Sequence, residues 1–211
     1  MIKKIFLVFL LLFIFSINKI LCKTITEDSG IASKDSFEIE VGSDLWKDTI
    51  SPYFGVKHSV TERMDFGIFL VYKDLLLKDY TFSSIEASTK FSFIPELFSL
   101  LFSFESINRE INGIFIFSKD FNPFSIDANL GFNQTLNQNL DLIYGLSLHL
   151  DLNSFGFYVE TTGTQENLSL WQLGSFFLIK KDFKLDLGLN GTYEKNPVLF
   201  FTCGFTYSLN Y

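Results

Sequence analysis

The sequence predicts an all-β protein, a transmembrane antiparallel up-and-down β-barrel of about 12 strands. Of its 211 residues, 47% are hydrophobic and 27 are Phe, yet no apolar run after the amino terminus is long enough for a membrane helix. Most of the chain instead alternates apolar and polar residues with a period of two. Alternation of this kind is typical of strands that face lipid on one side and water on the other.

The carboxy-terminal stretch 198–211 shows this alternation most clearly. It is longer than the roughly 5 or 6 residues of a soluble strand and reaches the roughly 9 to 11 that cross a bilayer at a tilt. A final strand that ends on an aromatic residue looks like the assembly signal of outer-membrane barrels. This signal would be carried by Phe205, Tyr207, Leu209 and Tyr211. The expected location is therefore the outer membrane of a diderm bacterium, with outer-membrane lipid and the barrel assembly machinery as partners.

Residues 1–22 have the form of an export signal. Lys3 and Lys4 precede a short apolar block, which is followed by Ser16, Asn18 and Lys19. This pattern predicts a cleaved signal peptide rather than an anchor. A lipidated cysteine is normally preceded by an apolar residue three positions before it and a small residue directly before it, whereas Lys19 and Leu21 precede Cys22. Lipidation is therefore the weaker interpretation. Residues 23–36 are polar and without a period, which predicts a periplasmic lead-in to a barrel at 37–211.

The charge of the chain excludes some partners. Removing residues 1–22 takes away three lysines and no acid, which shifts the formal charge from −7 to −10. An acidic protein of this kind is a poor ligand for nucleic acid and suits neutral or cationic solutes. Cys203 would be the only cysteine left, too few for a disulfide or a metal site, and it reads as a small hydrophobic residue of the outer face.

The even count of predicted strands supports a single-chain barrel. Their joins also alternate between short turns and longer loops, and counting back from a periplasmic carboxy terminus places the short turns on the periplasmic side. The main alternative, a secreted β-sandwich, would not bury this much Phe and Leu between two sheets. The predicted strands are 37–42, 53–60, 64–73, 85–93, 97–107, 111–121, 124–133, 140–152, 155–160, 168–179, 183–193 and 198–211.

Three of these strands are less regular than the others. The polar face of 64–73 carries Phe69 and Val71, the alternation of 111–121 is weak, and the facing of 168–179 around Trp171 is ambiguous.

Several segments resemble the outer-membrane family named for the MetA pathway of phenol degradation, whose members are described as putative transporters. The shared pattern is a lysine strand, a Ser-Lys-Asp turn before an Asn-x-Gly strand, a Glu strand and an Asp-x-Gly strand. The resemblance implies passage of small, often aromatic or hydrophobic compounds. A Pro-Thr-Gly element of that family is missing from the fifth strand. The resembling segments are 85–91, 118–132, 142–148, 158–163 and 180–190.

Polar positions of the strands predict the residues that line the barrel lumen. Charged groups inside a protein either form ion pairs or contact water. These side chains therefore either brace the barrel through ion pairs or line a water-filled lumen. For any one of them the bracing role is the stronger interpretation. The lumen-lining candidates are Glu86, Lys90, Glu105, Asp127, Asn129, Asp141, His149, Asp151, Tyr158, Glu160, Lys184 and Asp186.

Three hypotheses for function follow. The first is a narrow channel or uptake route for a small-molecule solute that is neutral or hydrophobic and aromatic. The second is a structural or surface-exposed barrel with a filled lumen. The third is a lipid hydrolase that uses Ser147 and His149, which share one strand face; a spacing of two also arises by chance, so we predict that the chain is not an enzyme. No sequence motif calls for a metal or cofactor.

Overall fold

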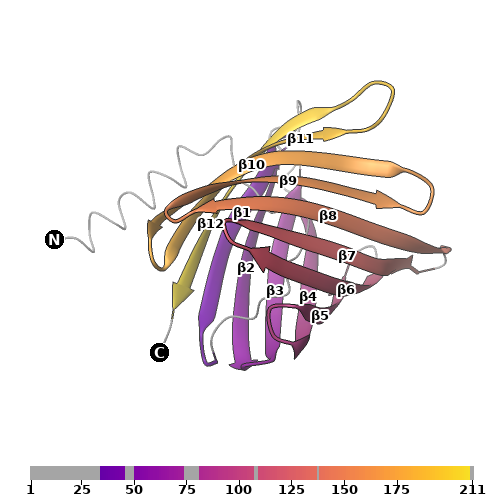
Figure 1. The fold of residues 1–211 in the computed structure, drawn as a ribbon. Helices are drawn as coiled ribbons and strands as arrows, with labels where there is room; N and C mark the ends of the chain where they lie inside the picture. The colour runs from indigo at the N-terminus through magenta and orange to yellow at the C-terminus, as the bar shows by residue number, and fades with distance from the viewer. Residues whose placement is uncertain (1–33, 46–49, 74–80, 107–108, 137, 210–211) are drawn as a thin grey trace.

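The computed structural model describes residues 34–45, 50–73, 81–106, 109–136 and 138–209. Twelve antiparallel strands form a closed barrel in which each strand pairs with its sequence neighbours and β1 closes against β12 (Figure 1). The strands are β1 (Phe37–Leu45), β2 (Ile50–Thr61), β3 (Met64–Lys73), β4 (Thr81–Ile94), β5 (Phe98–Glu105), β6 (Glu110–Phe121), β7 (Phe124–Thr135), β8 (Leu140–Leu152), β9 (Phe155–Thr164), β10 (Leu168–Lys180), β11 (Phe183–Thr192) and β12 (Leu199–Leu209).

The predicted strand count and order are confirmed, whereas several strand ends differ from the prediction. β2 begins at Ile50 rather than at residue 53, because Pro52 and its cross-strand partner Ser43 interrupt the apolar pattern without interrupting the ladder. β4 begins earlier, at Thr81, and β9 continues to Thr164, through polar residues that carry no alternation. Strand ends are the least reliable part of a periodicity argument because the pattern fades there.

The connections alternate in length around the barrel. Those at 62–63, 95–97, 122–123, 153–154 and 181–182 have two or three residues. The connections at the other end, at 46–49, 74–80, 106–109, 136–139, 165–167 and 193–198, are mostly longer. Two of the tight turns contain a left-handed residue, Glu96 with φ 58° and Asn153 with φ 63°. We refer to the two ends of the barrel as the short-turn end and the long-connection end.

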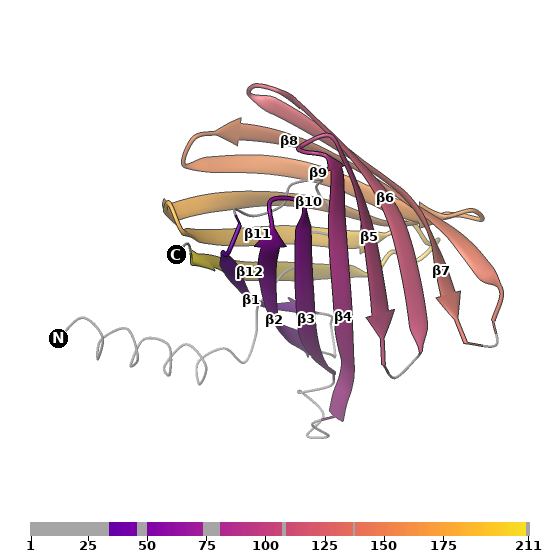
Figure 2. The ribbon, with the colours of Figure 1, turned by 90° about the horizontal axis from the view of Figure 1, so that it is seen from below.

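The outer surface of the barrel is apolar. Large side chains such as Phe66, Leu130, Leu146 and Phe201 point outward and are exposed, and the same is true along every wall. The strands are strongly tilted, as barrel closure requires, so that β2–β5 and β9–β12 cross at a steep angle in Figure 2. A belt of exposed apolar side chains around a closed barrel is the surface that lipid requires. Among the described residues there is no helix with the length and apolar character needed to span a membrane.

Glycines opposite aromatic rings shape the inner wall. The Phe69 ring covers Gly55 on the neighbouring strand, and the Tyr158 ring covers Gly174. A Cβ atom at Gly174 would lie 2.1 Å from the Tyr158 ring, and one at Gly55 would lie 2.2 Å from the Phe69 ring. These glycines therefore allow bulky inward side chains to lie flat along the wall, which leaves room in the centre.

Candidate functional site in the barrel interior

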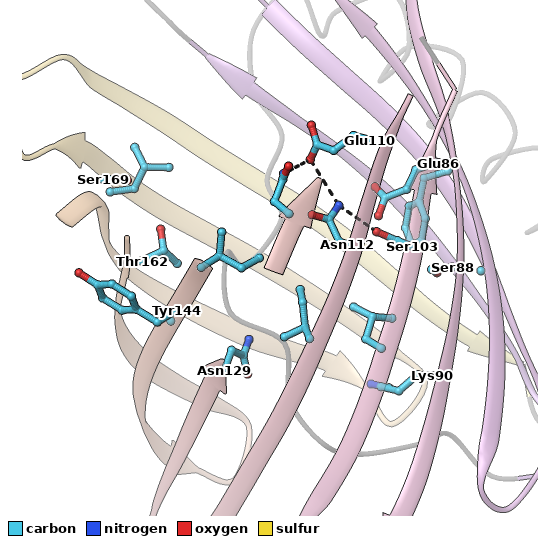
Figure 3. Close-up of a pocket in the computed structure, with 18 of the residues that line it drawn as sticks. Glu86, Ser88, Lys90, Ser103, Glu110, Asn112, Asn129, Tyr144, Thr162 and Ser169 are labelled. Carbon is cyan, nitrogen blue, oxygen red and sulfur yellow. Dashed lines mark hydrogen bonds between the residues drawn. The ribbon is translucent and has the colours of Figure 1, made fainter. Parts of the chain in front are cut away.

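A cavity of about 530 Å³ occupies the barrel interior, from mid-height toward the long-connection end (Figure 3). It is bounded by strands from all around the barrel, because inward residues of β1–β12 alternate with the lipid-facing ones. Its walls combine charged, amide, hydroxyl and apolar side chains. The inward residues that line it include Asp44, Lys57, Asp65, Phe69, Glu86, Ser88, Lys90, Leu101, Ser103, Glu110, Asn112, Ile114, Asn129, Asn133, Ile143, Thr162, Leu170, Asn190 and Phe200.

One wall of this cavity, on β4–β6, is acidic. The register places Glu86 directly opposite Glu105, and Glu105 directly opposite Glu110, so that three inward carboxylates stand in one row. Glu110 Oε1 accepts hydrogen bonds from the amides of Asn112, at 3.3 Å, and Asn133. Figure 3 shows Glu86 and Glu110 near each other at the edge of the cavity. We refer to Glu86, Glu105 and Glu110 as the acidic row.

The two lysines of the cavity lie deeper and beside acids. Lys57 Nζ is 2.7 Å from Glu40 Oε1 and 5.8 Å from the centre of the Phe69 ring. Lys90 is buried and stands directly opposite Asp65 across β3 and β4. Lys57 therefore has an acid within ion-pair distance, and Lys90 has one directly opposite it on the neighbouring strand.

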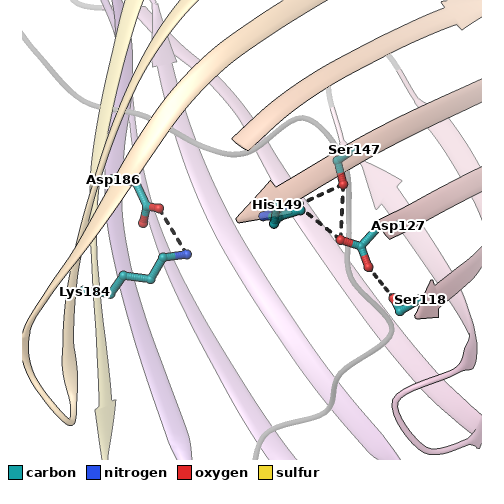
Figure 4. Close-up of polar contacts among 6 residues, drawn as sticks. All are labelled: Ser118, Asp127, Ser147, His149, Lys184 and Asp186. Carbon is teal, nitrogen blue, oxygen red and sulfur yellow. Dashed lines mark hydrogen bonds and ion pairs between the residues drawn. The ribbon is translucent and has the colours of Figure 1, made fainter. Parts of the chain in front are cut away.

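A compact polar cluster fixes the wall formed by β6, β7 and β8 (Figure 4). Asp127 accepts hydrogen bonds from Ser118, at 2.5 Å, and Ser147, at 3.2 Å. His149 Nε2 lies 2.9 Å from Ser147 Oγ and 3.2 Å from Asp127 Oδ2. Ser147 is only 1% exposed. We refer to Ser118, Asp127, Ser147 and His149 as the Asp127 cluster.

Buried amides continue this polar layer across β9–β12. Gln172 Nε2 donates to Thr202 Oγ1 at 3.1 Å and lies 3.5 Å from the Tyr158 hydroxyl. Asn190 Nδ2 donates to Thr202 Oγ1 at 3.0 Å and to the Phe200 carbonyl at 3.4 Å. Side chains that are completely buried in this way brace the wall rather than offering themselves to solvent.

The short-turn half of the lumen contains a further charged pair. Lys184 Nζ is 3.1 Å from Asp186 Oδ1 and 5.3 Å from the centre of the Phe176 ring. In Figure 4 the Lys184 side chain extends from β11 toward His149 on β8. Side chains from β8 and β11 therefore reach into this half of the lumen.

The structure distributes the lumen-lining candidates among these groups. Glu86, Lys90 and Asn129 line the cavity, and Glu105 is in the acidic row beside it. Asp127 and His149 belong to one cluster, whereas Tyr158 and Glu160 are buried in the adjoining wall. Lys184 and Asp186 form the pair near the short-turn end. Asp141 and Asp151 are exposed at opposite ends of β8.

Several interior residues were missing from the predicted list of lumen-lining candidates. Glu110, Asn112 and Asn133 shape the acidic wall, and Gln172 and Asn190 brace the opposite side. The signal that could have found Glu110 is its place two residues before Asn112, on the same face of a strand. That signal was masked because Ile114 and Ile116, further along the same face, are apolar.

Three of the four residues of the predicted assembly signal, Phe205, Tyr207 and Leu209, belong to β12. Tyr207 is exposed, and Phe205 stacks on Phe183 of the neighbouring strand with ring centroids 5.5 Å apart. Leu209 ends the strand, opposite Phe37 of β1. Tyr211, like residues 1–33, lies outside the described residues, so the assembly signal and the signal peptide remain predictions.

The chain matches no family model and no curated protein sequence. It does resemble solved structures, all at low sequence identity. The NanC porin aligns with a TM-score of 0.61 at 9% identity, over 82% of this chain and 100% of that chain. The COG4313 outer membrane channel from Pseudomonas putida F1 aligns with 0.60 at 8%, over 89% and 100%. Outer membrane phospholipase A from Escherichia coli aligns with 0.52 at 7%, over 90% and 94%.

Because these sequence identities are so low, the structural similarity establishes a shared fold only. The same barrel type contains a porin, a channel and a phospholipase, so fold alone does not choose among functions. Because no family model matches, the resemblance to the MetA-pathway family remains a prediction. The closed twelve-strand architecture and the apolar outer surface together identify the chain as an outer-membrane β-barrel protein.

Proposed function

We propose that this barrel is a narrow channel or uptake route for small molecules across the outer membrane. The observation that carries the proposal is the cavity of about 530 Å³ inside the barrel. Cavities between roughly 300 and 1,000 Å³ are the size that holds small organic molecules. The likeness to a porin and to an outer membrane channel supports the same reading.

The lining of the cavity suggests that neutral and hydrophobic or aromatic solutes are within its range. Leu101, Ile114 and Ile143 line it from β5, β6 and β8. Leu170 and Phe200 line it from β10 and β12. Apolar side chains with a few polar groups between them are typical of sites for small organic ligands. The resemblance to the MetA-pathway family favours the same class of solute.

A filled barrel without transport is the second candidate. The Asp127 cluster, Tyr158, Gln172 and the Lys184–Asp186 pair all occupy interior space below the cavity. If these side chains close the lumen completely, the cavity is a blind pocket. The difference between the two candidates is whether solute crosses the short-turn half.

A lipid hydrolase is the weaker alternative. In a serine hydrolase the histidine receives the serine proton at one ring nitrogen and contacts the acid through the other. In the Asp127 cluster a single nitrogen, Nε2 of His149, lies next to both Ser147 and Asp127, and the Ser147 hydroxyl donates to Asp127. Ser147 is also buried on the interior side of the wall. This geometry supports a bracing role for the cluster.

Electrical recording tests the proposal directly. The full chain, folded and inserted into a planar bilayer bathed in potassium chloride, should give discrete steps of current as single barrels insert. A protein that is shown to be folded by its resistance to protease, and that gives no current, would favour the filled barrel.

A further inference from the structure

We propose that the wall formed by β5–β8 is a binding subsite for a neutral ring-shaped solute that has an apolar face and hydroxyl groups on adjacent carbons, as in a pyranoside or another cyclic polyol. This inference deepens the proposed function and rests on it, since it assumes that solutes enter the lumen. It assigns recognition of the solute to two neighbouring rows of inward residues.

The first row is apolar and continuous across four strands. Leu101 of β5 stands directly opposite Ile114 of β6, and Ile114 stands opposite Gly131 of β7. Gly131 in turn stands opposite Ile143 of β8. Leu101, Ile114 and Ile143 line the cavity, and Gly131 adds no side chain between the two isoleucines. A ring that lies across this row, which we call the apolar strip, buries its apolar face there.

The second row carries neutral hydrogen-bonding groups. Ser103, Asn112 and Asn133 are the next inward residues of β5, β6 and β7 toward the long-connection end, and they stand opposite one another in register. All three line the cavity. Two residues along a strand cover about 7 Å, a distance that a six-membered ring with its substituents spans. A ring on the apolar strip therefore brings its edge to this row.

Glu110 fixes the direction in which the two amides point. The amide nitrogens of Asn112 and Asn133 both donate to Glu110 Oε1, and Asn112 also donates to Ser103 Oγ at 3.2 Å. Figure 3 shows the Asn112 nitrogen turned toward Glu110 and Ser103. Because a carboxylate only accepts hydrogen bonds, the nitrogen and not the oxygen of each amide must face Glu110. Neither carbonyl oxygen accepts a hydrogen bond from a residue that the structure describes.

These groups match a solute with adjacent hydroxyls. The two carbonyl oxygens come from directly opposed residues of neighbouring strands, so they can accept from two neighbouring hydroxyl groups. The Ser103 oxygen accepts from Asn112, which leaves the Ser103 proton for an oxygen of the solute. An anion without donors would leave both carbonyl oxygens unpaired and would be repelled by Glu110. A hydrocarbon would also leave them unpaired, whereas a cyclic polyol satisfies both rows.

Binding is measured by saturation-transfer difference NMR on the full chain, folded in micelles of lauryldimethylamine oxide, with protein-free micelles as the blank. The probes are methyl glucoside and its fully O-methylated analogue, which keeps the ring but lacks hydroxyl donors. We expect methyl glucoside to bind about fivefold more tightly or better, the factor of roughly one net hydrogen bond. Myo-inositol is the third probe: equal binding assigns the subsite to cyclic polyols in general, and weaker binding assigns it to pyranosides.

The double variant Asn112→Leu/Asn133→Leu nearly keeps the side-chain sizes but removes both carbonyl oxygens, and it should bind methyl glucoside about fivefold more weakly or worse. The matched control is Asn167→Leu, in the exposed connection between β9 and β10, which should bind like the parent. Folding of each variant is checked by its protease resistance. The comparison of the two glucosides needs only the parent protein, so it stands even if the double variant does not fold.

Equal binding of the two glucosides, no binding of methyl glucoside, or undiminished binding in the folded double variant would overturn this inference. The proposed function is tested separately, by current through the same protein in a planar bilayer. Current without glucoside binding would leave the channel and remove the subsite. Binding without current would support the subsite and overturn transport.

Discussion

Nε2 of His149 lies 3.2 Å from Oδ2 of Asp127, on the interior face of two neighbouring strands. The same nitrogen contacts Ser147, and Asp127 also accepts a hydrogen bond from Ser118 on β6. Three strands of one wall are therefore joined by a single carboxylate. Asp127 is the residue on which the other three depend.

Replacing Asp127 with Ala should destabilise the barrel. The substitution leaves a histidine and two hydroxyl groups without their acceptor in a buried layer, at a cost of about 2 to 4 kcal/mol. The free energy of unfolding in urea, measured in lipid vesicles, checks this. Asp141→Ala is the control: it removes the same charge from the neighbouring strand β8, but Asp141 is exposed, so a change of about 0.5 kcal/mol or less is expected. Equal losses in both variants would refute the bracing role.

Ser147→Ala should leave solute passage intact. Its rate of phospholipid hydrolysis should be the same as that of the parent protein. The Ser147 hydroxyl donates to Asp127 and is buried, an arrangement that fits a bracing role better than attack on lipid. Hydrolysis of a phospholipid in mixed micelles is measured for both proteins. Activity in the parent protein that disappears in Ser147→Ala would restore the hydrolase hypothesis.

Gly174→Ala should lower the free energy of unfolding because the added methyl group would clash with the Tyr158 ring. A Cβ at this position would lie 2.1 Å from Tyr158, whose side chain is 2% exposed and cannot move aside easily. Overpacking of this kind costs about 1 to 3 kcal/mol. When Tyr158 is first replaced with Ser, Gly174→Ala should reduce the free energy of unfolding by much less. Additive effects of the two substitutions, measured by urea unfolding, would show that the ring is not the cause.

Lys184→Ala should raise the single-channel conductance. The Lys184 side chain extends toward His149 in the short-turn half of the lumen, so its removal widens the narrow part. Lys181→Ala, in the exposed turn between β10 and β11, serves as the control and should behave like the parent. A conductance that does not change in Lys184→Ala would place the constriction elsewhere.

Much of the fold could be predicted because lipid and water impose a period of two on every wall. The strands that looked irregular have local causes. Phe69 and Ile116 are apolar residues that point inward and are buried. β10 contains a register shift between Leu168 and Leu170, which changes which residues face out at the start of the strand. Trp171 consequently lies on the outer face, over Gly191.

The interior arrangement was harder to predict than the strands. Alternation identifies which residues face inward, but the grouping of those residues depends on register between strands. The acidic row joins Glu86, Glu105 and Glu110 only because of where β4, β5 and β6 begin. The proximity of Ser147 and His149 could be predicted, but the role of Asp127 required the pairing of β7 with β8.

Liposome swelling tests the central claim, that small solutes cross this barrel, most directly. Liposomes with the folded protein are placed in methyl glucoside or in phenyl glucoside, and the entry rates are compared with those of protein-free liposomes. The account predicts entry of both solutes, with the phenyl compound at least as fast despite its larger size, because apolar residues line the cavity. No entry of either solute through folded protein would contradict the account and leave a barrel with a filled lumen.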